Sequence, residues 1–338
     1  MENQKLGRQT FQPGSSPVII GHGSSAGHKE CQGPLRRHFD HTCEDDLFGA
    51  KTWEQAESSM QQLALDAALK RAGLHTQDLD LLLAGDLLNQ CIGSGYSARQ
   101  AAVPFFGLYG ACSTMGESLA LATLLLSGGY GKYAAAVTSS HFCSAERQYR
   151  TPLEYGCQRT PTAQWTATAS GAVIITSDVR PGPRVVRVTV GKVVDKGIKD
   201  ANNMGAAMAP SAYETLKAHF EDTGLTPDYY DLIVTGDLGQ LGHEIVTEFF
   251  AHDGVKLANY NDCGLLLFDR EAQDVHAGAS GCGCSASVLC GYLLPGLLAG
   301  RWKRILFCPT GALHSPTATM QGESIPGICH AIALEGGK

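Results

Sequence analysis

Cys112 is the residue whose type and setting most directly suggest chemistry. It stands in GACSTMGESLALATLLLSGG, between a turn of small residues and an apolar run that ends at two glycines. Thr114 followed by Glu117 has the spacing of a capping box, which predicts a helix that begins just after the cysteine. The amides and dipole of a helix start favour thiolate over thiol, so Cys112 could be a nucleophile. It could equally be a small buried thiol, because a catalytic cysteine needs a base nearby.

The elements that would position this cysteine occur twice along the chain. DLDLLLAGDL at residues 78–87 returns as YYDLIVTGDL at 229–238, and Gly73 and Gly224 precede the two copies at the same displacement. Each copy reads as a helix, a glycine stop, a short acidic turn and a buried strand that ends in Gly-Asp. An internal repeat of this kind is a strong indication of a duplicated architecture.

A second pair of blocks follows the first. Residues 110–138 match 282–310, which places Cys112 on Cys284. Both blocks read as turn, Cys-Ser, apolar helix, glycine, basic residue and strand. The duplication predicts two similar β-α-β-α-β halves, each with a chiefly parallel sheet covered by helices. The remaining edge strands are expected over 17–21 and 185–194.

Composition excludes several classes of protein. The 338 residues include 40 glycines, only 17% are charged, and the net charge of -7 opposes broad nucleic-acid binding. No N-terminal segment combines basic residues, an apolar run and a cleavage site, so we expect no cleaved signal peptide. The stretch 275–300 is too interrupted to span a bilayer and is expected to be a buried helix. The 12 cysteines are expected to be reduced and packed.

Two possible metal sites are visible in the sequence. The N-terminal segment is rich in histidine and cysteine, but its spacing fits no zinc template, so a polar loop is favoured. Asp86 and Asp237, related by the repeat, could coordinate calcium together with a ligand. Turn hydrogen bonds after their strands are the favoured interpretation. The N-terminal residues in question are His22, His28, Cys31, His38, His41 and Cys43.

The duplication, with a cysteine before a buried helix, resembles the thiolase fold of thiolases and β-ketoacyl condensing enzymes. Within that superfamily, many strings resemble the SpoVAD family of sporulation proteins, among them LLLAGDLLNQ, AAVTSSH, AERQYRTPLEYG, MGAAMAPSA, GASGCGCSA and ESIPGICH. The resemblance implies an α/β, thiolase-like fold in which two duplicated halves, 1–178 and 179–338, pack as a five-layer α-β-α-β-α sandwich. It also implies a homodimer at the edge of the first-half sheet, for which we assign strand 133–137.

The same resemblance implies a function. The family is expected to bind dipicolinic acid (pyridine-2,6-dicarboxylate) without catalysis, for uptake into the developing spore. Its expected partners are the other SpoVA channel proteins, with peripheral association at the spore inner membrane and no transmembrane helix. No cofactor and no nucleic acid are expected, although calcium could accompany the ligand as a counter-ion.

Two positions argue against condensing chemistry. In the ketoacyl synthase III branch that the chain resembles, a histidine follows the second-half strand and an asparagine opens the second buried helix. Here those strings read Gly236-Asp237-Leu238 and Gly281-Cys282-Gly283. Without these groups the transition state loses its stabilisation. An acyltransferase that pairs Cys112 with His141 or His314 remains the alternative, and a structural adaptor with a vestigial site is a third.

A site for a flat aromatic dianion should offer cations or amides at both ends of an apolar slot. Helix-mouth amides near Cys112 and Cys284 suit one carboxylate. Arg147 could instead form a surface ion pair, and Lys192 could lie on the solvated face of a strand over 190–194. The candidate cations are Lys51, His141, Arg147, Arg150, Lys192, Lys196, His314 and His330.

Overall fold

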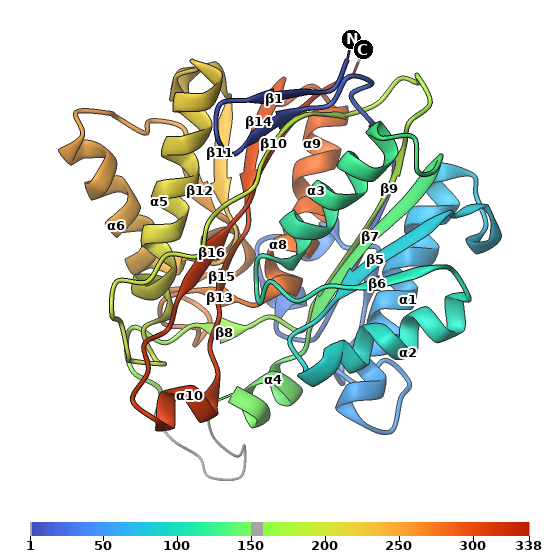
Figure 1. Ribbon diagram of the computed structural model, residues 1–338. Coiled ribbons are helices and arrows are strands. Elements are labelled where there is room, and N and C mark those ends of the chain that lie inside the picture. The colour runs from blue at the N-terminus through green and yellow to red at the C-terminus, as the bar shows by residue number, and fades with distance from the viewer. Residues whose placement is uncertain (1, 150–157, 338) are drawn as a thin grey trace.

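The computed structural model describes residues 2–149 and 158–337. At its centre lie two five-stranded arrays, joined where Val18 pairs with Arg184 (Figure 1). The first array has the order β3 (Val18–Ala26), β9 (Ala169–Thr176), β7 (Tyr133–Ser140), β5 (Leu81–Gly85) and β6 (Phe105–Gly107). The second has the order β10 (Arg184–Thr189), β17 (Ala331–Glu335), β14 (Arg304–Cys308), β11 (Leu232–Thr235) and β12 (Tyr260–Asp262).

The two arrays repeat each other in strand direction as well as in order. In each, the second strand is antiparallel to both of its neighbours, and the last three strands are parallel. In each array the first strand therefore runs in the same direction as the last three, so the sheets are chiefly parallel as expected, and β9 and β17 alone of the ten strands reverse direction. The duplication itself is confirmed.

Three edge assignments need correction. Strands β3 and β10 meet each other through Val18 and Arg184 and so do not form free outer edges. Strand β10 ends at Thr189, so residues 190–194 continue as irregular chain. Strand β7, which we had assigned to a dimer edge, lies between β5 and β9. The outer edge of the first array is β6.

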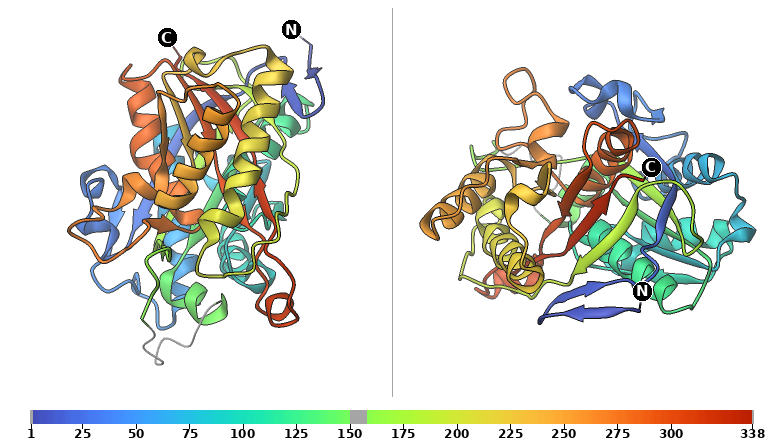
Figure 2. Two further views of the ribbon diagram at one scale, coloured as in Figure 1. Left: turned by 90° about the vertical axis from the view of Figure 1, so that its left-hand side faces the viewer. Right: turned by 90° about the horizontal axis from the view of Figure 1, so that it is seen from above.

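Helices complete the five layers (Figures 1 and 2). Helix α1 (Trp53–Ala72) with α2 (Ile92–Ala101) covers one outer face, and α5 (Met204–Thr223) with α6 (Gly239–His252) covers the other. Between the arrays lie α3 (Thr114–Ser127) and a second central helix, formed by α8 (Cys282–Val288), the π-helical turn η7 (Leu289–Leu293) and α9 (Leu294–Leu298). Helices α1 and α5 both end at a left-handed glycine, Gly73 with φ 67° and Gly224 with φ 68°.

Shorter elements surround this framework. The strands are β1 (Gln4–Leu6), β2 (Thr10–Gln12), β4 (His41–Thr42), β8 (Trp165–Thr166), β13 (Ala279–Ser280), β15 (Thr310–Ala312) and β16 (Gly327–Cys329). The short helices are α4 (Phe142–Tyr149), α7 (Cys263–Leu267) and α10 (Pro316–Met320). Single 3-10 turns occupy η1 (Glu30–Gln32), η2 (Arg36–His38), η3 (Thr76–Asp78), η4 (Asn89–Cys91) and η6 (Pro227–Tyr229).

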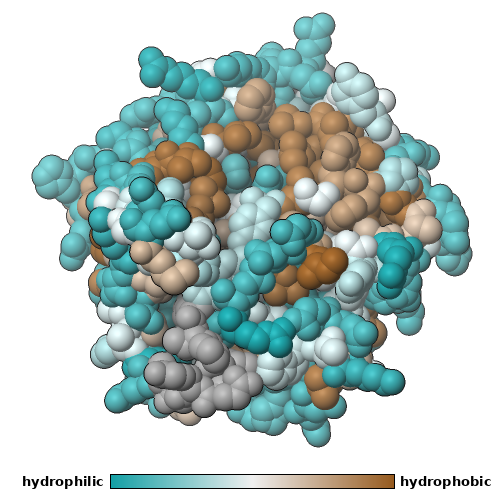
Figure 3. Space-filling model, turned by 60° about the horizontal axis from the view of Figure 1, so that its bottom comes forward, coloured by the Kyte–Doolittle hydropathy of each residue, from teal (hydrophilic) through white to brown (hydrophobic). Residues whose placement is uncertain are grey.

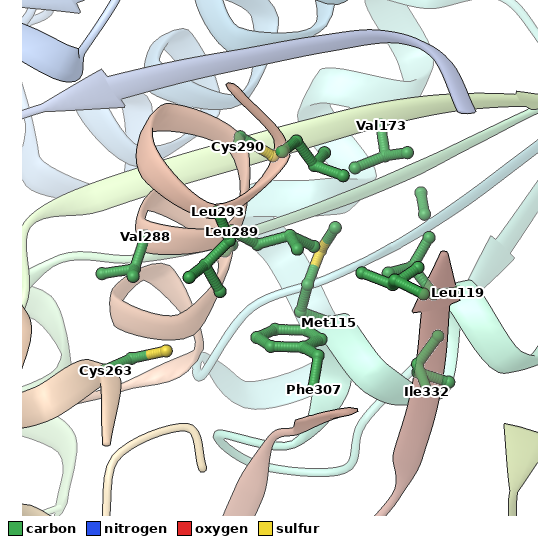
Figure 4. Close-up of a cluster of buried hydrophobic side chains, with 14 of the residues drawn as sticks. Met115, Leu119, Val173, Cys263, Val288, Leu289, Cys290, Leu293, Phe307 and Ile332 are labelled. Atoms are coloured by element: carbon green, nitrogen blue, oxygen red, sulfur yellow. The ribbon is translucent and has the colours of Figure 1, made fainter. Parts of the chain in front are cut away.

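The main core fills the space between the two central helices and the sheets (Figure 4). Met115 and Leu119 of α3 meet Leu289 of the second central helix, Phe307 of β14 and Ile332 of β17, all fully buried. Each such side chain contributes roughly 1.5–3 kcal/mol through removal from water. This packing fixes where the two helix starts, and hence Cys112 and Cys282, stand relative to each other.

Two glycines allow the second central helix to approach the first array closely. A Cβ at Gly171 of β9 would lie 2.3 Å from the carbonyl oxygen of Ala286, and one at Gly283 would lie 2.2 Å from that of Ala169. Only the absence of side chains permits this contact. The second central helix begins at Cys282. The sequence stretch 275–300 had predicted a start at Val275.

The start of α3 also differs from the expected capping box. The Thr114 hydroxyl donates to the Ala111 carbonyl at 2.6 Å and accepts from the Gly110 amide at 3.1 Å. Oε2 of Glu117 is buried and has no hydrogen-bond partner among the described residues. Thr114 therefore closes the turn ahead of the helix, and Glu117 does not cap it.

The β1–β2 hairpin crosses to the other half of the chain. Strand β2 pairs with β10, and the Asp222 carboxylate accepts the amides of Arg8, Gln9 and Thr10. Residues 4–12 thus pack on the C-terminal half.

Within residues 2–149 and 158–337, every helix is too short or too polar to cross a bilayer.

Candidate functional site

A small cavity lies over Cys112 where the two halves meet. Its volume of about 40 Å³ is far below the roughly 300–1,000 Å³ common for sites that enclose a drug-sized ligand. A ring-sized ligand would therefore require the lining side chains to move. The lining residues come from the turn before α3, from α4 and α5, and from strands β8, β13 and β15 with their flanking loops. They are Leu87, Tyr109, Ala111, Cys112, Ala145, Glu146, Tyr149, Thr166, Met204, Ser280, Ala312 and His314.

The Cys112 thiol lies beside the Asp237 carboxyl, which comes two residues after the end of β11. The carboxyl is fully buried and accepts from the Thr310 hydroxyl at 2.8 Å and the Gly281 amide at 3.0 Å. Burial raises the pKa of Asp237 to about 7. Burial and the neighbouring Asp237 carboxylate hold the pKa of Cys112 well above its usual range. These effects outweigh the helix start, so Cys112 is a thiol and not a thiolate at neutral pH.

Cys282 stands close to Cys112 at the start of α8. Both belong to one buried cluster with Leu87 and Ala145. The Cys282 thiol donates to the Ser139 carbonyl at 2.9 Å, and burial raises its pKa well above the usual range. At the two positions where the sequence resemblance implies a histidine and an asparagine in condensing enzymes, this chain thus has a carboxyl and a thiol. The Cys282 thiol proton is already engaged by the Ser139 carbonyl, so this pair does not supply the two N–H donors that those residues would direct at an oxyanion.

The partner cysteine in the repeat does not reach the cavity. Cys284 is fully buried one turn into α8, and its sulfur lies 3.6 Å from the Gly236 carbonyl oxygen. Burial raises its pKa well above the usual range. Just ahead of this helix Ser280 lines the cavity, whereas the Gly281 amide is engaged by Asp237.

Asp86 makes the expected turn hydrogen bond after its strand, because it accepts the amide of Leu88 at 2.8 Å as well as that of Ser94 at 2.7 Å. For Asp237 the expectation was wrong, because its carboxyl accepts from Gly281 and Thr310 in other segments, while the amides of Leu238 and Gly239 donate to Asp262. Across residues 2–149 and 158–337, no three His, Cys, Asp or Glu side chains are grouped so that they could hold a metal ion. The N-terminal histidines and cysteines are therefore dispersed.

The two candidate bases occupy different settings. His314 lines the cavity, and its Nε2 lies 3.1 Å from the Tyr149 carbonyl oxygen and its Nδ1 3.2 Å from the Thr319 hydroxyl. His141 is not among the lining residues, and its Nε2 donates to the Asp46 carbonyl at 2.8 Å while its Nδ1 accepts the Cys143 amide at 3.2 Å. Burial also lowers the pKa of His141. With both nitrogens engaged, His141 is not placed to deprotonate Cys112.

Most of the other candidate cations lie away from the cavity. Arg147 forms a surface ion pair with Glu54 and lies over the Trp53 ring at 5.1 Å. Lys51, Lys192 and Lys196 are exposed, the last two on the irregular segment after β10. Burial lowers the pKa of His330 to about 4, and its Nδ1 accepts the Gly191 amide at 3.3 Å. Arg150 lies outside the described residues.

Comparison with known proteins shows the family to which the chain belongs. The sequence profile of the family described as stage V sporulation protein AD (SpoVAD) matches residues 7–335. The chain belongs to the SpoVAD family. It is 45% identical over 331 residues to stage V sporulation protein AD of Bacillus subtilis (strain 168), and the match covers 97% of each chain.

The fold of this SpoVAD-family chain is that of the thiolase-like condensing enzymes. 3-Oxoacyl-[acyl-carrier-protein] synthase III from Aquifex aeolicus VF5 superposes with a TM-score of 0.59 at 14% identity, covering 94% of this chain and 99% of that one. The tetronic acid condensing enzyme AbyA1 gives a TM-score of 0.61 at 18% identity, covering 94% and 100%. At these identities the likeness shows the fold alone.

The sequence did not indicate several residues that line the cavity over Cys112. The hydroxyls of Tyr109 and Tyr149 lie 2.5 Å apart, and Glu146 accepts a hydrogen bond from Thr166 at 3.1 Å. These residues come from three separate segments whose local patterns carry no sign of a shared site. The one signal was indirect, since Glu146 and Tyr149 stand in the string AERQYRTPLEYG.

Proposed function

We propose that this SpoVAD-family chain binds dipicolinic acid in the cavity over Cys112 without catalysing a reaction, and delivers it to membrane channel proteins during spore formation. The burial of Cys112 beside the Asp237 carboxyl carries the non-catalytic part of the proposal. A thiol held protonated beside a carboxyl is a poor nucleophile, because the thiolate is the reactive form. What remains at this position of the fold is a cavity with polar groups on its walls.

The cavity walls suit a flat aromatic ring better than they suit a bare dianion. Tyr109 and Tyr149 supply aromatic surface, and Thr166, Ser280 and His314 supply hydrogen-bonding groups. Glu146 on the wall and Asp237 beneath Cys112 would repel two free carboxylates. We therefore propose that dipicolinate enters together with calcium, or with a proton shared with Asp237.

Calorimetric titration tests this proposal. We expect saturable heat when dipicolinate is added with equimolar calcium, and weaker binding when calcium is replaced by sodium. Pyridine-2,4-dicarboxylate serves as a control of equal charge and different geometry. Folded protein that gives no saturable heat with dipicolinate under either condition would overturn the proposal.

An acyltransferase remains the second candidate, because Cys112 lines a cavity in the fold of condensing enzymes. Intact mass after incubation with a panel of acyl-CoA thioesters separates the two functions. A stable adduct that disappears in Cys112→Ala would favour the enzyme. No adduct across the panel, together with dipicolinate binding, would favour the binder.

We also propose a homodimer, with the second copy paired along β6. Phe105 and Phe106 on this outer edge are 38% and 51% exposed, although both are large and apolar. Leu121 and Leu125 of α3 are only partly buried, and an apolar area extends over this side of the molecule in Figure 3. An uncovered apolar edge strand is otherwise a site of uncontrolled pairing, which a second copy would prevent.

A further inference from the structure

One ionisable side chain behind the cavity wall is fully buried and does not line the cavity itself. Glu57 belongs to α1, and its Oε1 lies 3.0 Å from the Ser139 hydroxyl near the end of β7. Its Oε2 lies 3.1 Å from the Ser144 hydroxyl of α4. Helix α4 supplies part of the cavity wall. Glu57 thus links α1 both to a central strand and to that wall.

The hydrogen bonds around Ser144 place a proton on Glu57. The Ser144 hydroxyl also lies 3.2 Å from the His141 carbonyl oxygen. A hydroxyl has one proton to donate, so it cannot serve this carbonyl and an ionised Glu57 at the same time. A proton on Oε2 of Glu57 resolves the conflict, because Glu57 then donates to Ser144, Ser144 donates to His141, and Ser139 donates to Oε1. Each contact in this chain then has one donor and one acceptor.

The neighbouring Asp86 explains why the proton is on Glu57. Asp86 accepts the amides of Leu88 and Ser94 at 2.8 and 2.7 Å and the Ser94 hydroxyl at 2.6 Å. These three donors oppose the rise in the pKa of Asp86 that burial causes, whereas the partners of Glu57 are two hydroxyls. Burial and the Asp86 charge raise the pKa of Glu57 well above its usual range. A Cβ at Gly93 of α2 would lie 3.3 Å from both side chains, so α2 packs directly over the pair.

Other ionisable groups around the pair do not take over this role. Two thiols stay protonated because burial raises their pKa, and one imidazole stays neutral because burial lowers its pKa. One carboxylate of α1 is paired with a guanidinium of α4. A charge on Glu57 would therefore act chiefly on Asp86. In this order the groups are Cys91, Cys282, His141, Glu54 and Arg147.

Helix α4 depends on the buried contact with Glu57 because its other polar ties are exposed. The helix has eight residues. Two exposed pairs join it to Glu54 of α1 and to Asn89 of η4. Exposed pairs of this kind contribute little to stability. The buried link from Glu57 to Ser144 is therefore the polar contact that holds this wall most firmly.

We propose that Glu57, in its protonated form, is a positioning residue for the cavity over Cys112. Its proton holds α4 through Ser144, and its second oxygen holds Ser139, whose carbonyl accepts the Cys282 thiol at 2.9 Å. When the proton leaves, two buried negative charges face each other, and α4 moves outward so that water reaches them. This inference rests on the proposed function only for the identity of the ligand.

Infrared spectroscopy and amide hydrogen exchange test the role of Glu57 without any ligand. At pH 7 the wild type should show a carbonyl band of a protonated carboxylic acid that Glu57→Gln lacks. Ser144→Ala and Glu57→Ala should lower the protection of the α4 amides roughly three- to tenfold relative to α5. Glu57→Gln keeps an acceptor and a permanent donor, so α4 should stay protected. Glu221→Gln, the same change at an exposed position of α5, is the matched control and should match the wild type in both measurements.

The pH profile gives the decisive comparison. As pH rises from 6 to 10, protection of α4 in the wild type, corrected for the intrinsic exchange rate, should fall only where the Glu57 carbonyl band disappears. In Glu57→Gln it should show no such fall. Loss of α4 protection with the band intact, persistence of protection after the band has gone, or a spectrum that Glu57→Gln leaves unchanged would overturn the positioning role.

Dipicolinate titration separates this role from the proposed function. Ser144→Ala should bind dipicolinate roughly three- to tenfold more weakly than the wild type, and Glu57→Gln should bind it equally well. If α4 responds as expected but the wild type gives no saturable heat, the proposed function fails and the positioning role stands. If the wild type binds dipicolinate and Ser144→Ala changes neither α4 exchange nor affinity, the positioning role fails and ligand binding stands.

Discussion

The thiol of Cys112, just before a central helix in the first half, lies beside the carboxyl of Asp237, which follows a strand in the second half. The duplication brings both residues to the same junction. A carboxyl at this place acts on the thiol in the opposite sense to an imidazole, because it stabilises the protonated sulfur. The same scaffold thus carries a cysteine that is adapted to stay neutral.

Asp237→Asn should make Cys112 more reactive. Removing the negative charge relieves one of the two causes that hold the pKa of the thiol high, while burial remains. We expect the rate at which iodoacetamide alkylates Cys112 at pH 8.5 to rise several-fold. Peptide mass mapping measures this rate. Cys43, which is partly exposed and distant in the fold, is the internal control and should react at an unchanged rate. An unchanged rate at Cys112 would mean that access alone limits it.

The same substitution should change how stability depends on pH. The pKa of Asp237 is raised from 3.8 to about 7, so the folded state holds this proton more tightly than the unfolded state. The protonated carboxyl stabilises the folded state by on the order of a few kcal/mol; this contribution is complete below about pH 4 and is lost as pH rises to about 7. The midpoint temperature of thermal unfolding should therefore fall less steeply between pH 5 and pH 8 for Asp237→Asn than for the wild type. Parallel plots of that midpoint against pH for the two proteins would contradict the raised pKa of Asp237.

His314 should matter for dipicolinate binding, and the outlying lysines should not. His314 lines the cavity, whereas Lys51 and Lys192 are exposed and lie away from it. Loss of one hydrogen bond to a charged ligand is worth about 1.5–3 kcal/mol, or roughly tenfold to a hundredfold in affinity. His314→Ala should show that loss by calorimetry, and Lys51→Ala and Lys192→Ala should show none. The reverse order would move the ligand to another site.

Filling the cavity should abolish ligand binding without unfolding the protein. Ala145 lies on its wall in α4 and is 3% exposed, so Ala145→Leu places a larger side chain where the ligand ring would lie. Circular dichroism should stay native-like, while the calorimetric signal disappears. Ala299→Leu, which adds the same atoms at an exposed position, is the matched control. Full binding by Ala145→Leu would exclude this cavity.

Phe106→Asp should disrupt the proposed dimer. Phe106 is 51% exposed on the β6 edge, and a charge there would oppose strand pairing with a second copy. Sedimentation velocity should show a shift from dimer to monomer at micromolar concentration. Phe249→Asp, at a residue 38% exposed on α6, changes an exposed phenylalanine elsewhere and should stay dimeric. A wild-type protein that sediments as a monomer would remove the dimer from the proposal.

The repeat in the sequence predicted the framework well, because the two copies share local signals. Helix, glycine stop and buried strand fall at equivalent positions in α1 to β5 and in α5 to β11. Strand direction was not predictable in the same way. An apolar run has the same pattern whether its strand is parallel or antiparallel, so the reversal of β9 and β17 left no local trace. The edge strand β6, only three residues long, was missed for lack of any periodic signal.

The candidate site was harder to predict than the fold. Cys112 and His314 are the members of the predicted ligand set that line the cavity, and both stand at the ends of repeated elements. Arg147 and Lys192 were predicted to contact the ligand because of their charge, but both side chains lie at the surface of the protein. The contact of Cys112 with Asp237 joins distant segments, and only the packing of the central helices against the sheets determines it.

The last residues of the chain have a practical consequence for experiments. A Cβ at Gly337 would lie 2.0 Å from the carbonyl oxygen of Gly182, and Gly182 lines a groove together with Leu294 and Leu298 of α9. The N- and C-terminal ends emerge at the same end of the molecule (Figure 1). Immobilisation on a sensor through a C-terminal tag would thus shield this groove while leaving the cavity over Cys112 open to small solutes.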